Sequence, residues 1–309
     1  MRVGGAVIGP HRRRSGICHT ALEGNIAAGY LVGMDLSLVI MAAGLGSRFG
    51  GTKQLVEVGP NGEAFLDFAI KDGRAAGCDQ VVLIIRTDIE EDVKAHLVRQ
   101  YGSLDGFVFV RQDEFGVQRD KPWGTAHAVL ATADVVPGGF IVVNADDYYG
   151  PSSFQLAADA LAGADEKTAA LVAFELAKTL PDEGSVSRGV CAVDNGSLVS
   201  ITETHGIARA EDGVIRSEDP AGELTDATMV SMNMFAFTNS LYGHLASQWE
   251  EFFAAFSEEP KKEYLLPDVV DRLRQEGELS VKVPVSAEEW IGVTNPNDLD
   301  PARAKLAHR

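Results

Sequence analysis

Short apolar runs alternate with amphipathic stretches along the chain. Two stretches, 65–76 and 88–101, carry apolar residues at helical spacing, and each ends before a glycine. Around them lie runs that are apolar at nearly every position, as expected of parallel strands buried on both faces of a sheet: 36–41, 81–85 and 140–143. Alternation of buried strands with helices predicts an α/β protein with a Rossmann-like, doubly wound sheet.

The second half of the chain predicts antiparallel pairing in addition. Residues 189–194 and 198–203 flank an Asn195-Gly196 turn and predict a β-hairpin. The apolar stretch 228–237 predicts another strand. The remaining predicted elements are helices at 125–133, 152–161, 241–256, 267–275 and near Asn297, and strands at 107–110, 169–176 and 279–285. The sequence therefore predicts a mixed doubly wound sheet with a β-hairpin elaboration, and residues 34–309 are expected to form a single domain.

Residues 1–33 differ in composition from the rest of the chain. They contain four arginines and one acidic residue, and they lack the clean apolar core that a signal peptide needs. We interpret them as a disordered or non-native amino-terminal extension. Met34 stands just before the first buried run, and a translation start at this residue is a hypothesis that the intact mass of the native protein tests.

The charge balance narrows the classes of partner. The 309 residues include 27 Lys and Arg against 45 Asp and Glu, a formal net charge of −18. Such a surface repels nucleic acid and anionic membranes, and no apolar run approaches the length of a membrane-spanning helix. The 3 cysteines are far apart and fit neither a disulfide framework nor zinc spacing, so a reducing, cytoplasmic location is expected. The oligomeric state does not follow from the sequence.

The loop after the first buried run is the strongest candidate for chemistry. Residues 42–54 read Ala-Ala-Gly-Leu-Gly-Ser-Arg-Phe-Gly-Gly-Thr-Lys-Gln. Glycines allow backbone N–H groups to approach phosphate oxygens, and Arg48 and Lys53 add positive charge to an acidic protein. Phe49 breaks the dinucleotide-binding fingerprint, and the Gly-Lys-Ser/Thr ending of a Walker loop is absent. The loop therefore predicts a triphosphate site, with a simple tight turn as the alternative.

This loop sequence is similar to the signature of a known enzyme family. Ala-Ala-Gly-x-Gly-x-Arg followed by Lys resembles the signature of the sugar-phosphate nucleotidyltransferases, which join a nucleoside triphosphate to a sugar 1-phosphate and release pyrophosphate. Further matches, in the family's order, extend the resemblance over residues 36–299: Gly124-Thr125-Ala126-His127-Ala128, Asn144-Ala145-Asp146, Gly189, Glu203 and Asn233. The resemblance implies a Mg²⁺-dependent enzyme that uses a pyrimidine nucleoside triphosphate, UTP in first place and dTTP next.

The resemblance also implies a function for individual residues. Nucleotide contacts are implied for Ala42, Ala43, Gly44, Gly46, Gly124 and Thr125. Contacts to the sugar phosphate are implied for Gly189, Glu203 and Asn233. Catalysis is implied for Arg48, Lys53 and Asp146, with Mg²⁺ on Asp146 and with Asp147 and Asn295 as further candidate ligands.

Two departures from the family pattern stand out. The family often has a lysine directly after the sugar-binding glutamate, but Thr204 and His205 follow Glu203 here. Positive charge for a phosphate on that side must therefore come from elsewhere. Near the carboxyl end, where a second carboxylate or asparagine usually completes the metal site, Asn295 and Asp298 are the candidates.

Three alternatives compete with this interpretation. Cytidylyltransferases of alcohol phosphates share the Gly-x-Gly-x-Arg and Lys-Gln pattern but lack the Gly-Thr-Ala-His segment. A non-catalytic sensor of nucleotide sugars on the same fold is less favoured, because binding alone does not require the metal carboxylate Asp146. A nicotinamide-dependent oxidoreductase is disfavoured by Phe49 and by Arg86, which stands where an acidic residue is needed after the second strand.

Overall fold

The computed structural model describes residues 35–44, 53–181, 184–293 and 298–309. The predicted extension, residues 1–33, and the start at Met34 lie outside this part of the chain. Gly33–Arg309 forms one compact unit. No helix among the described residues combines the length and apolar character needed to cross a membrane.

The first half of this unit alternates strands and helices, as predicted. Its elements are β1 Leu36–Met41, η1 Lys53–Leu55, α1 Phe65–Ala75, β2 Gln80–Ile85, η2 Thr87–Ile89, α2 Glu90–Tyr101, β3 Phe107–Arg111, η3 Gln112–Glu114, α3 Thr125–Leu130, β4 Gly139–Asn144, β5 Asp147–Tyr148, α4 Pro151–Leu161 and β6 Thr168–Glu175.

The second half is richer in strands. Its elements are η4 Leu176–Lys178, β7 Val186–Asp194, β8 Ser197–Arg209, β9 Ile215–Glu218, β10 Ala221–Leu224, β11 Met229–Phe237, α5 Leu241–Phe256, α6 Leu266–Gln275, β12 Ser280–Lys282, β13 Val285–Ser286, β14 Ile291–Gly292 and α7 Leu299–Leu306.

β1 lies inside the parallel part of the sheet. It pairs in parallel with β2 and with β4, and β3 extends the sheet beyond β2. Met41 of β1 lies beside Asn144 of β4, and the N–H of Ala145 donates to the Met41 carbonyl at 3.1 Å. The glycine-rich loop after β1 and the acidic turn after β4 therefore begin at the same edge of the sheet, where open α/β sheets bind ligands.

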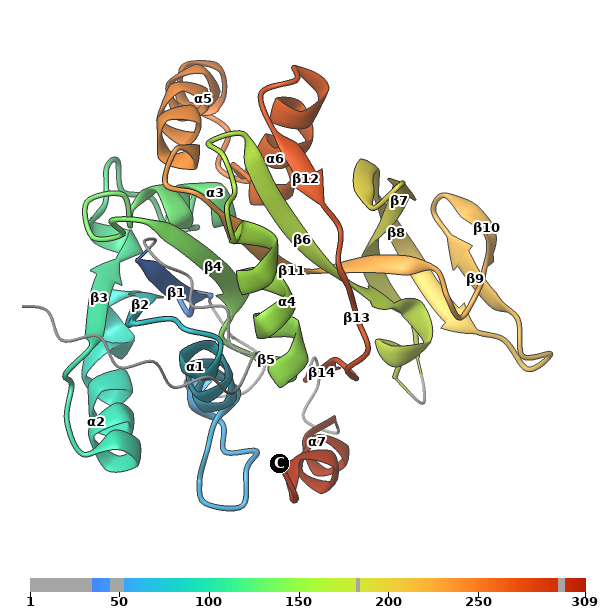
Figure 1. Cartoon of the computed structure of the whole chain (residues 1–309), viewed down its shortest axis with the longest axis horizontal. Helices are drawn as coiled ribbons and strands as arrows, with labels where there is room; N and C mark the ends of the chain where they lie inside the picture. Colours follow the sequence, from blue (N-terminus) through green and yellow to red (C-terminus); the bar gives the residue numbers. More distant parts are fainter. Residues whose placement is uncertain (1–34, 45–52, 182–183, 294–297) are drawn as a thin grey trace, which may run out of the picture. The chain divides into compact units, whose positions relative to one another are not determined.

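The second half closes part of the sheet into a ring. β11 runs antiparallel to β4, β6 and β7, and β7 pairs with β8 in the predicted hairpin. β12 pairs with both β8 and β6, so that β6, β11, β7, β8 and β12 form a closed ring of five strands (Figure 1). The mixed α/β sheet and the hairpin are confirmed. An open, doubly wound sheet is not confirmed, because β12 joins the hairpin to the main sheet.

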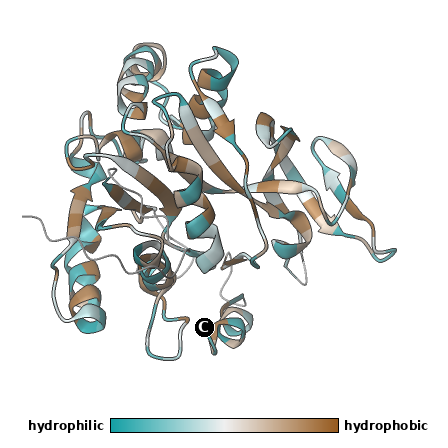
Figure 2. Ribbon diagram, viewed as in Figure 1, coloured by the Kyte–Doolittle hydropathy of each residue, from teal (hydrophilic) through white to brown (hydrophobic). Residues whose placement is uncertain are grey.

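Helices cover both faces of the parallel strands. Leu38 and Ile40 of β1 pack on the side of α1 and α4, and Val39 packs on the side of α3, α5 and α6. Figure 1 shows these two groups of helices on opposite sides of the sheet, and Figure 2 shows the hydrophobic colouring concentrated on the strands between them. The near-continuous apolar runs in the sequence are explained by this burial on both faces.

A few predicted bounds differ in the structure. The helix expected at 125–133 ends at Leu130, and the strand expected at 279–285 is divided into β12 and β13. Pro284 lies between these two strands and has no N–H to donate, although its carbonyl still accepts the N–H of Ala173 at 3.0 Å. The pairs β5–β14 and β9–β10 were not predicted, because strands of two to four residues leave too little pattern to recognise.

Asp72 in α1 makes the stability of the fold depend on pH. Its side chain is buried, and burial raises the pKa of this carboxyl to about 6, with Glu288 acting in the same direction and Lys71 and Arg309 acting against it. The unfolded chain ionises this group near its ordinary pKa, so the native state loses stability as the pH rises from about 4 to about 6 and stays less stable above that range.

We therefore expect Asp72→Asn to stabilise the protein above this range. The gain in the free energy of unfolding at about pH 7.5 is up to about 3 kcal/mol, and it should vanish near pH 4. Chemical denaturation at both pH values measures it, with Asp92→Asn at an exposed position of α2 as the control. Equal stability of Asp72→Asn and the wild type at about pH 7.5 would contradict the account.

Candidate active site

Polar side chains gather where β4 ends. The Asn144 side-chain amide donates to Asp147 Oδ2 at 2.8 Å, and the Tyr149 hydroxyl lies 3.2 Å from the same oxygen. This hydroxyl also lies 3.0 Å from the Met232 carbonyl of β11 and accepts the N–H of Asn144 at 3.1 Å. Burial raises the pKa of Tyr149 well above its ordinary value, so the hydroxyl keeps its proton. This buried network fixes the turn that carries Asp146 next to β11.

β11 carries an irregularity close to this turn. Its register with β6 shifts between Ser231 and Phe235, and Asn233 has a φ of 60°. A left-handed conformation is uncommon for a residue other than glycine and marks a local constraint. The N–H of Asn233 donates to Ser231 Oγ at 3.3 Å. Such irregularities bend a strand and re-aim a side chain, and here the affected residue is one to which the sequence resemblance pointed.

The hairpin brings two further predicted residues opposite each other. Gly189 of β7 pairs with Glu203 of β8 on one side and with Ser231 of β11 on the other. A Cβ atom at Gly189 would lie 2.8 Å from Ile201 Cγ2 and 3.4 Å from Ser231 Cβ. The close approach of these three strands therefore requires a glycine at position 189.

These segments line a single cavity of about 270 Å³, which we call the acidic cavity. Its lining includes five residues that the sequence resemblance singled out: Asp146, Asp147, Gly189, Glu203 and Asn233. Three of them are carboxylates, and they give the cavity its negative character. The structure thus brings together residues that lie up to 87 positions apart in the chain (146 to 233).

Asp146 and Asp147 offer hard oxygen ligands to a cation. Within the described ranges, no three His, Cys, Asp or Glu side chains converge as a complete metal cage. Mg²⁺ does not need such a cage, because one or two carboxylates usually hold it together with water and substrate phosphates. Asp147 Oδ2 accepts hydrogen bonds from Asn144 and Tyr149, and Asp146 directly precedes it in the turn that lines the cavity. This donor set fits magnesium.

Arg188 also lines the acidic cavity, and the sequence analysis did not single it out. The side chain is buried, and its guanidinium lies 4.9 Å from the ring centre of Trp290. Burial lowers the pKa of Arg188 to about 10, although Asp147 and Glu203 act in the opposite direction, so the group is charged at neutral pH. The sequence feature that could have pointed to Arg188 is its position directly before Gly189, a residue for which the resemblance implies a contact to the sugar phosphate.

The segment expected to contact the base is held by α6. Gly124 has a φ of 114° and directly precedes α3, and Gln112 donates from its side-chain amide to the Gly124 carbonyl at 3.2 Å. Thr125 Oγ1 accepts the N–H of Leu266 at 2.9 Å. Neither Gly124 nor Thr125 is among the described residues that line the acidic cavity. The Thr125 oxygen ties α3 to α6, and a contact between Thr125 and a base stays a prediction.

Both ends of the glycine-rich loop are described. Ala42 and Ala43 are buried at the end of β1, and the N–H of Ala42 donates to the Ile84 carbonyl at 2.8 Å. The Gly44 carbonyl accepts a hydrogen bond from the Gln54 side chain at 2.7 Å, so the two ends of the loop meet. This contact explains why glutamine follows the lysine in the loop sequence.

Several predicted site residues cannot be placed in this way. Lys53 begins η1, but its side chain lies outside the described part of the chain, and so do Gly46, Arg48 and Asn295. Asp298 directly precedes α7 and is not among the described residues that line the acidic cavity. Their implied functions therefore stay predictions.

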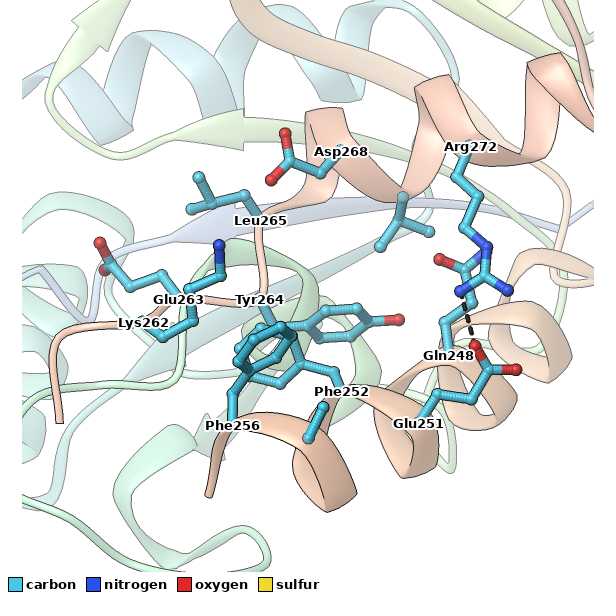
Figure 3. Close-up of a pocket in the computed structure, with 12 residues that line it drawn as sticks. Gln248, Glu251, Phe252, Phe256, Lys262, Glu263, Tyr264, Leu265, Asp268 and Arg272 are labelled. Carbon is cyan, nitrogen blue, oxygen red and sulfur yellow. Dashed lines mark hydrogen bonds and ion pairs between the residues drawn. The ribbon is translucent and has the colours of Figure 1, made fainter. Parts of the chain in front are cut away.

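A second cavity, of about 340 Å³, lies between α5 and α6 (Figure 3). Phe252, Phe256 and Tyr264 form an aromatic wall, and Arg272 at one end forms an ion pair with Glu251 at 2.7 Å. None of the site residues predicted from the sequence is among its described lining. Besides Arg272, its lining includes Lys262, whose Nζ lies 5.2 Å from the ring centre of Phe256. It offers no glycine-rich backbone and lies apart from the edge where β1 and β4 end, so the acidic cavity is the better candidate for phosphate chemistry.

The first half of the chain matches a known domain family. Residues 38–180 match the MobA-like NTP transferase domain. This span contains the glycine-rich loop, the Gly124-Thr125 segment and Asp146. No match was found among curated protein sequences.

Several solved structures share the fold over most of the chain. A protein from Bacillus anthracis assigned as a glucose-1-phosphate thymidylyltransferase has a TM-score of 0.61 at 14% identity, covering 89% of this chain and 96% of that one. The inositol-1-phosphate CTP transferase from T. maritima has a TM-score of 0.58 at 16% identity, covering 89% and 97%. A UDP-glucose pyrophosphorylase from Acinetobacter baumanii has a TM-score of 0.56 at 15% identity, covering 88% of this chain and 93% of that one.

At such identities these likenesses show the fold, and the family match carries the assignment. The match over residues 38–180 identifies this part of the chain as a nucleotidyltransferase domain, as the resemblance in the sequence implied.

Proposed function

We propose that this protein transfers a nucleotidyl group from a pyrimidine nucleoside triphosphate, UTP in first place and dTTP next, to a sugar 1-phosphate in a Mg²⁺-dependent reaction. The products are a nucleotide sugar and pyrophosphate. The observation that carries the proposal is the convergence of Asp146, Glu203 and Asn233 on one cavity, at the edge of the sheet where the glycine-rich loop begins.

The reaction needs no nucleophile from the protein. An oxygen of the acceptor's ionised phosphate forms a bond to the α-phosphorus of the triphosphate. The bond from this phosphorus to the oxygen that bridges to the β-phosphate breaks, and its electron pair leaves with pyrophosphate. Catalysis then depends on positioning the two substrates and on stabilising negative charge.

Each part of the site has a task in this scheme. Asp146, with Asp147 beside it, holds the magnesium ion, which when bound neutralises charge on the phosphates. Backbone N–H groups of the loop after β1 bind the triphosphate, and Arg48 and Lys53 stabilise the leaving pyrophosphate. Glu203 and Asn233 bind sugar hydroxyls, since a carboxylate accepts and an amide both donates and accepts hydrogen bonds.

CTP with an alcohol phosphate is the alternative substrate pair. The inositol-1-phosphate CTP transferase resembles this fold about as well as the other two proteins do. The Lys53-Gln54 pair also fits that class, whereas the Gly-Thr-Ala-His segment favours the nucleotide-sugar enzymes. A non-catalytic sensor would bind nucleotide without releasing pyrophosphate.

A screen of pyrophosphate release separates these possibilities. Five nucleoside triphosphates (ATP, GTP, CTP, UTP and dTTP) are paired with sugar 1-phosphates and with alcohol phosphates in the presence of Mg²⁺. We expect release only when both substrates are present, with UTP fastest. Fastest release from CTP with an alcohol phosphate would support the alternative, and nucleotide binding without any release by folded protein would contradict an enzymatic function.

A further inference from the structure

No lysine is among the described residues that line the acidic cavity, and Thr204 stands where the enzymes that the sequence resembles often have one. Thr204, which stands in that place after Glu203, is buried, and its hydroxyl donates to the Thr202 carbonyl at 3.0 Å. The next residue, His205, lies with its Nδ1 2.8 Å from Ser187 Oγ. Neither residue supplies a cation to the acidic cavity. A phosphate placed beside three carboxylates nevertheless needs one.

Arg188 is the cationic side chain among the described residues that line this cavity. Nη2 donates to the Thr179 carbonyl at 2.7 Å, Nη1 to the Ser187 carbonyl at 2.9 Å, and Nε to Thr179 Oγ1 at 3.3 Å. A guanidinium carries five N–H hydrogens, so one remains on Nη1 and one on Nη2. These hydrogen bonds and the Trp290 ring hold the guanidinium in a fixed orientation before any ligand binds.

The partners of this buried cation are neutral oxygens. Asp147 and Glu203 act on Arg188 through space, but its three hydrogen bonds with described residues go to two carbonyls and a hydroxyl. A buried charge without an opposite charge in contact is costly, and an anion that reaches it removes that cost. Two N–H groups of one guanidinium also match the spacing of two phosphate oxygens.

We propose that Arg188, on β7, binds the phosphate of the acceptor. The acceptor is then held between Arg188 at its phosphate and Glu203 and Asn233 at its hydroxyls. This inference rests on the proposed nucleotidyl transfer to a phosphate acceptor. It adds the residue that selects a phosphorylated acceptor over its neutral parent.

The test compares Arg188→Met and Arg188→Lys with the wild type. Arg216→Met is the matched control, because Arg216 lies on β9, half-exposed, with its guanidinium on Asp212 at 2.8 Å. For the sugar 1-phosphate that the wild type uses fastest, Arg188→Met should raise the acceptor KM about 10–100-fold and leave the KM for the nucleotide nearly unchanged. Arg188→Lys keeps the positive charge but loses the paired N–H groups of the guanidinium, so its acceptor KM should lie between those of the wild type and Arg188→Met.

Orthophosphate provides a second readout that does not depend on turnover. With Mg²⁺ present, calorimetry should detect binding of orthophosphate to the wild type and to Arg216→Met, and much weaker binding to Arg188→Met. If Arg188→Met does not fold, as judged by its thermal transition, Arg188→Lys gives the comparison.

The outcomes for Arg188 and for the proposed function differ. An unchanged acceptor KM and unchanged orthophosphate binding in folded Arg188→Met or Arg188→Lys would overturn the assignment of Arg188 while leaving nucleotidyl transfer intact. A folded wild-type protein that binds nucleotide but releases no pyrophosphate with any of the acceptors tested would overturn the proposed function itself, and the assignment of Arg188 with it.

Discussion

Asp146→Asn is expected to lower kcat by about 10²–10³ while the protein stays folded. The carboxylate lines the acidic cavity at the end of β4, and hydrogen bonds among Asn144, Asp147 and Tyr149 hold the turn there. Asparagine keeps the size of the side chain but removes the charge that attracts Mg²⁺. The defect should therefore become smaller as the concentration of Mg²⁺ is raised. Steady-state pyrophosphate release over a range of Mg²⁺ concentrations measures both effects.

Substitutions of two other aspartates, Asp147 and Asp134, serve as comparisons for Asp146→Asn. Asp147→Asn should lower thermal stability as well as activity, because Oδ2 of Asp147 belongs to the buried network with Asn144 and Tyr149. Asp134→Asn, at an exposed position before β4, should change neither. A kcat of Asp146→Asn close to that of the wild type would remove Asp146 from the mechanism.

Gly124→Ala is expected to cost about 2–4 kcal/mol in the free energy of unfolding. Gly124 has a φ of 114° and a ψ of 178°, a conformation that is essentially restricted to glycine. A Cβ atom there would lie 2.4 Å from the Tyr264 carbonyl oxygen. That oxygen accepts the N–H of Ala126 at 3.0 Å, so relief of the clash must break the junction between α3 and α6. Chemical denaturation measures the loss.

Gly163→Ala provides a control at a glycine that has a positive φ but no clash. Gly163 also has a positive φ, of 66°, but a Cβ atom there would meet nothing within 4 Å. Gly163→Ala should therefore cost only about 1 kcal/mol. If the Gly124→Ala variant folds, its KM for the nucleotide should rise more than its KM for the acceptor. Equal costs for the two variants would contradict the constraint that the structure places on Gly124.

Strands that appear in the sequence as continuous apolar runs were predicted correctly. The run 36–41 became β1 with the same bounds, and the run 140–143 became the core of β4, so the edge at which the loop and Asp146 meet was predictable. The Asn195-Gly196 turn predicted the hairpin, but a register shift between Ala192 and Val193 brings Gly189 opposite Glu203, and the turn alone does not predict that pair. The order in which the strands lie side by side in the sheet was not predictable from these local patterns.

The features that were missed depend on contacts between distant strands. β12 closes the ring through the Lys282–Ser197 pair with β8, and three residues of strand give no pattern that announces it. Arg188 was missed for a related reason, since arginine in a hairpin is usually exposed. Its contacts with Thr179 and Trp290 join segments that are distant in the sequence, and neither contact is visible in the local sequence.

The central claim, that transfer takes place in the acidic cavity, is tested most directly by a crystal structure with Mg²⁺, a non-hydrolysable analogue of UTP and a sugar 1-phosphate. The account predicts Mg²⁺ on Asp146, the sugar hydroxyls within hydrogen-bonding distance of Glu203 and Asn233, and the acceptor phosphate against Arg188. Both substrates bound in the cavity between α5 and α6, with no ligand near Asp146, would contradict it.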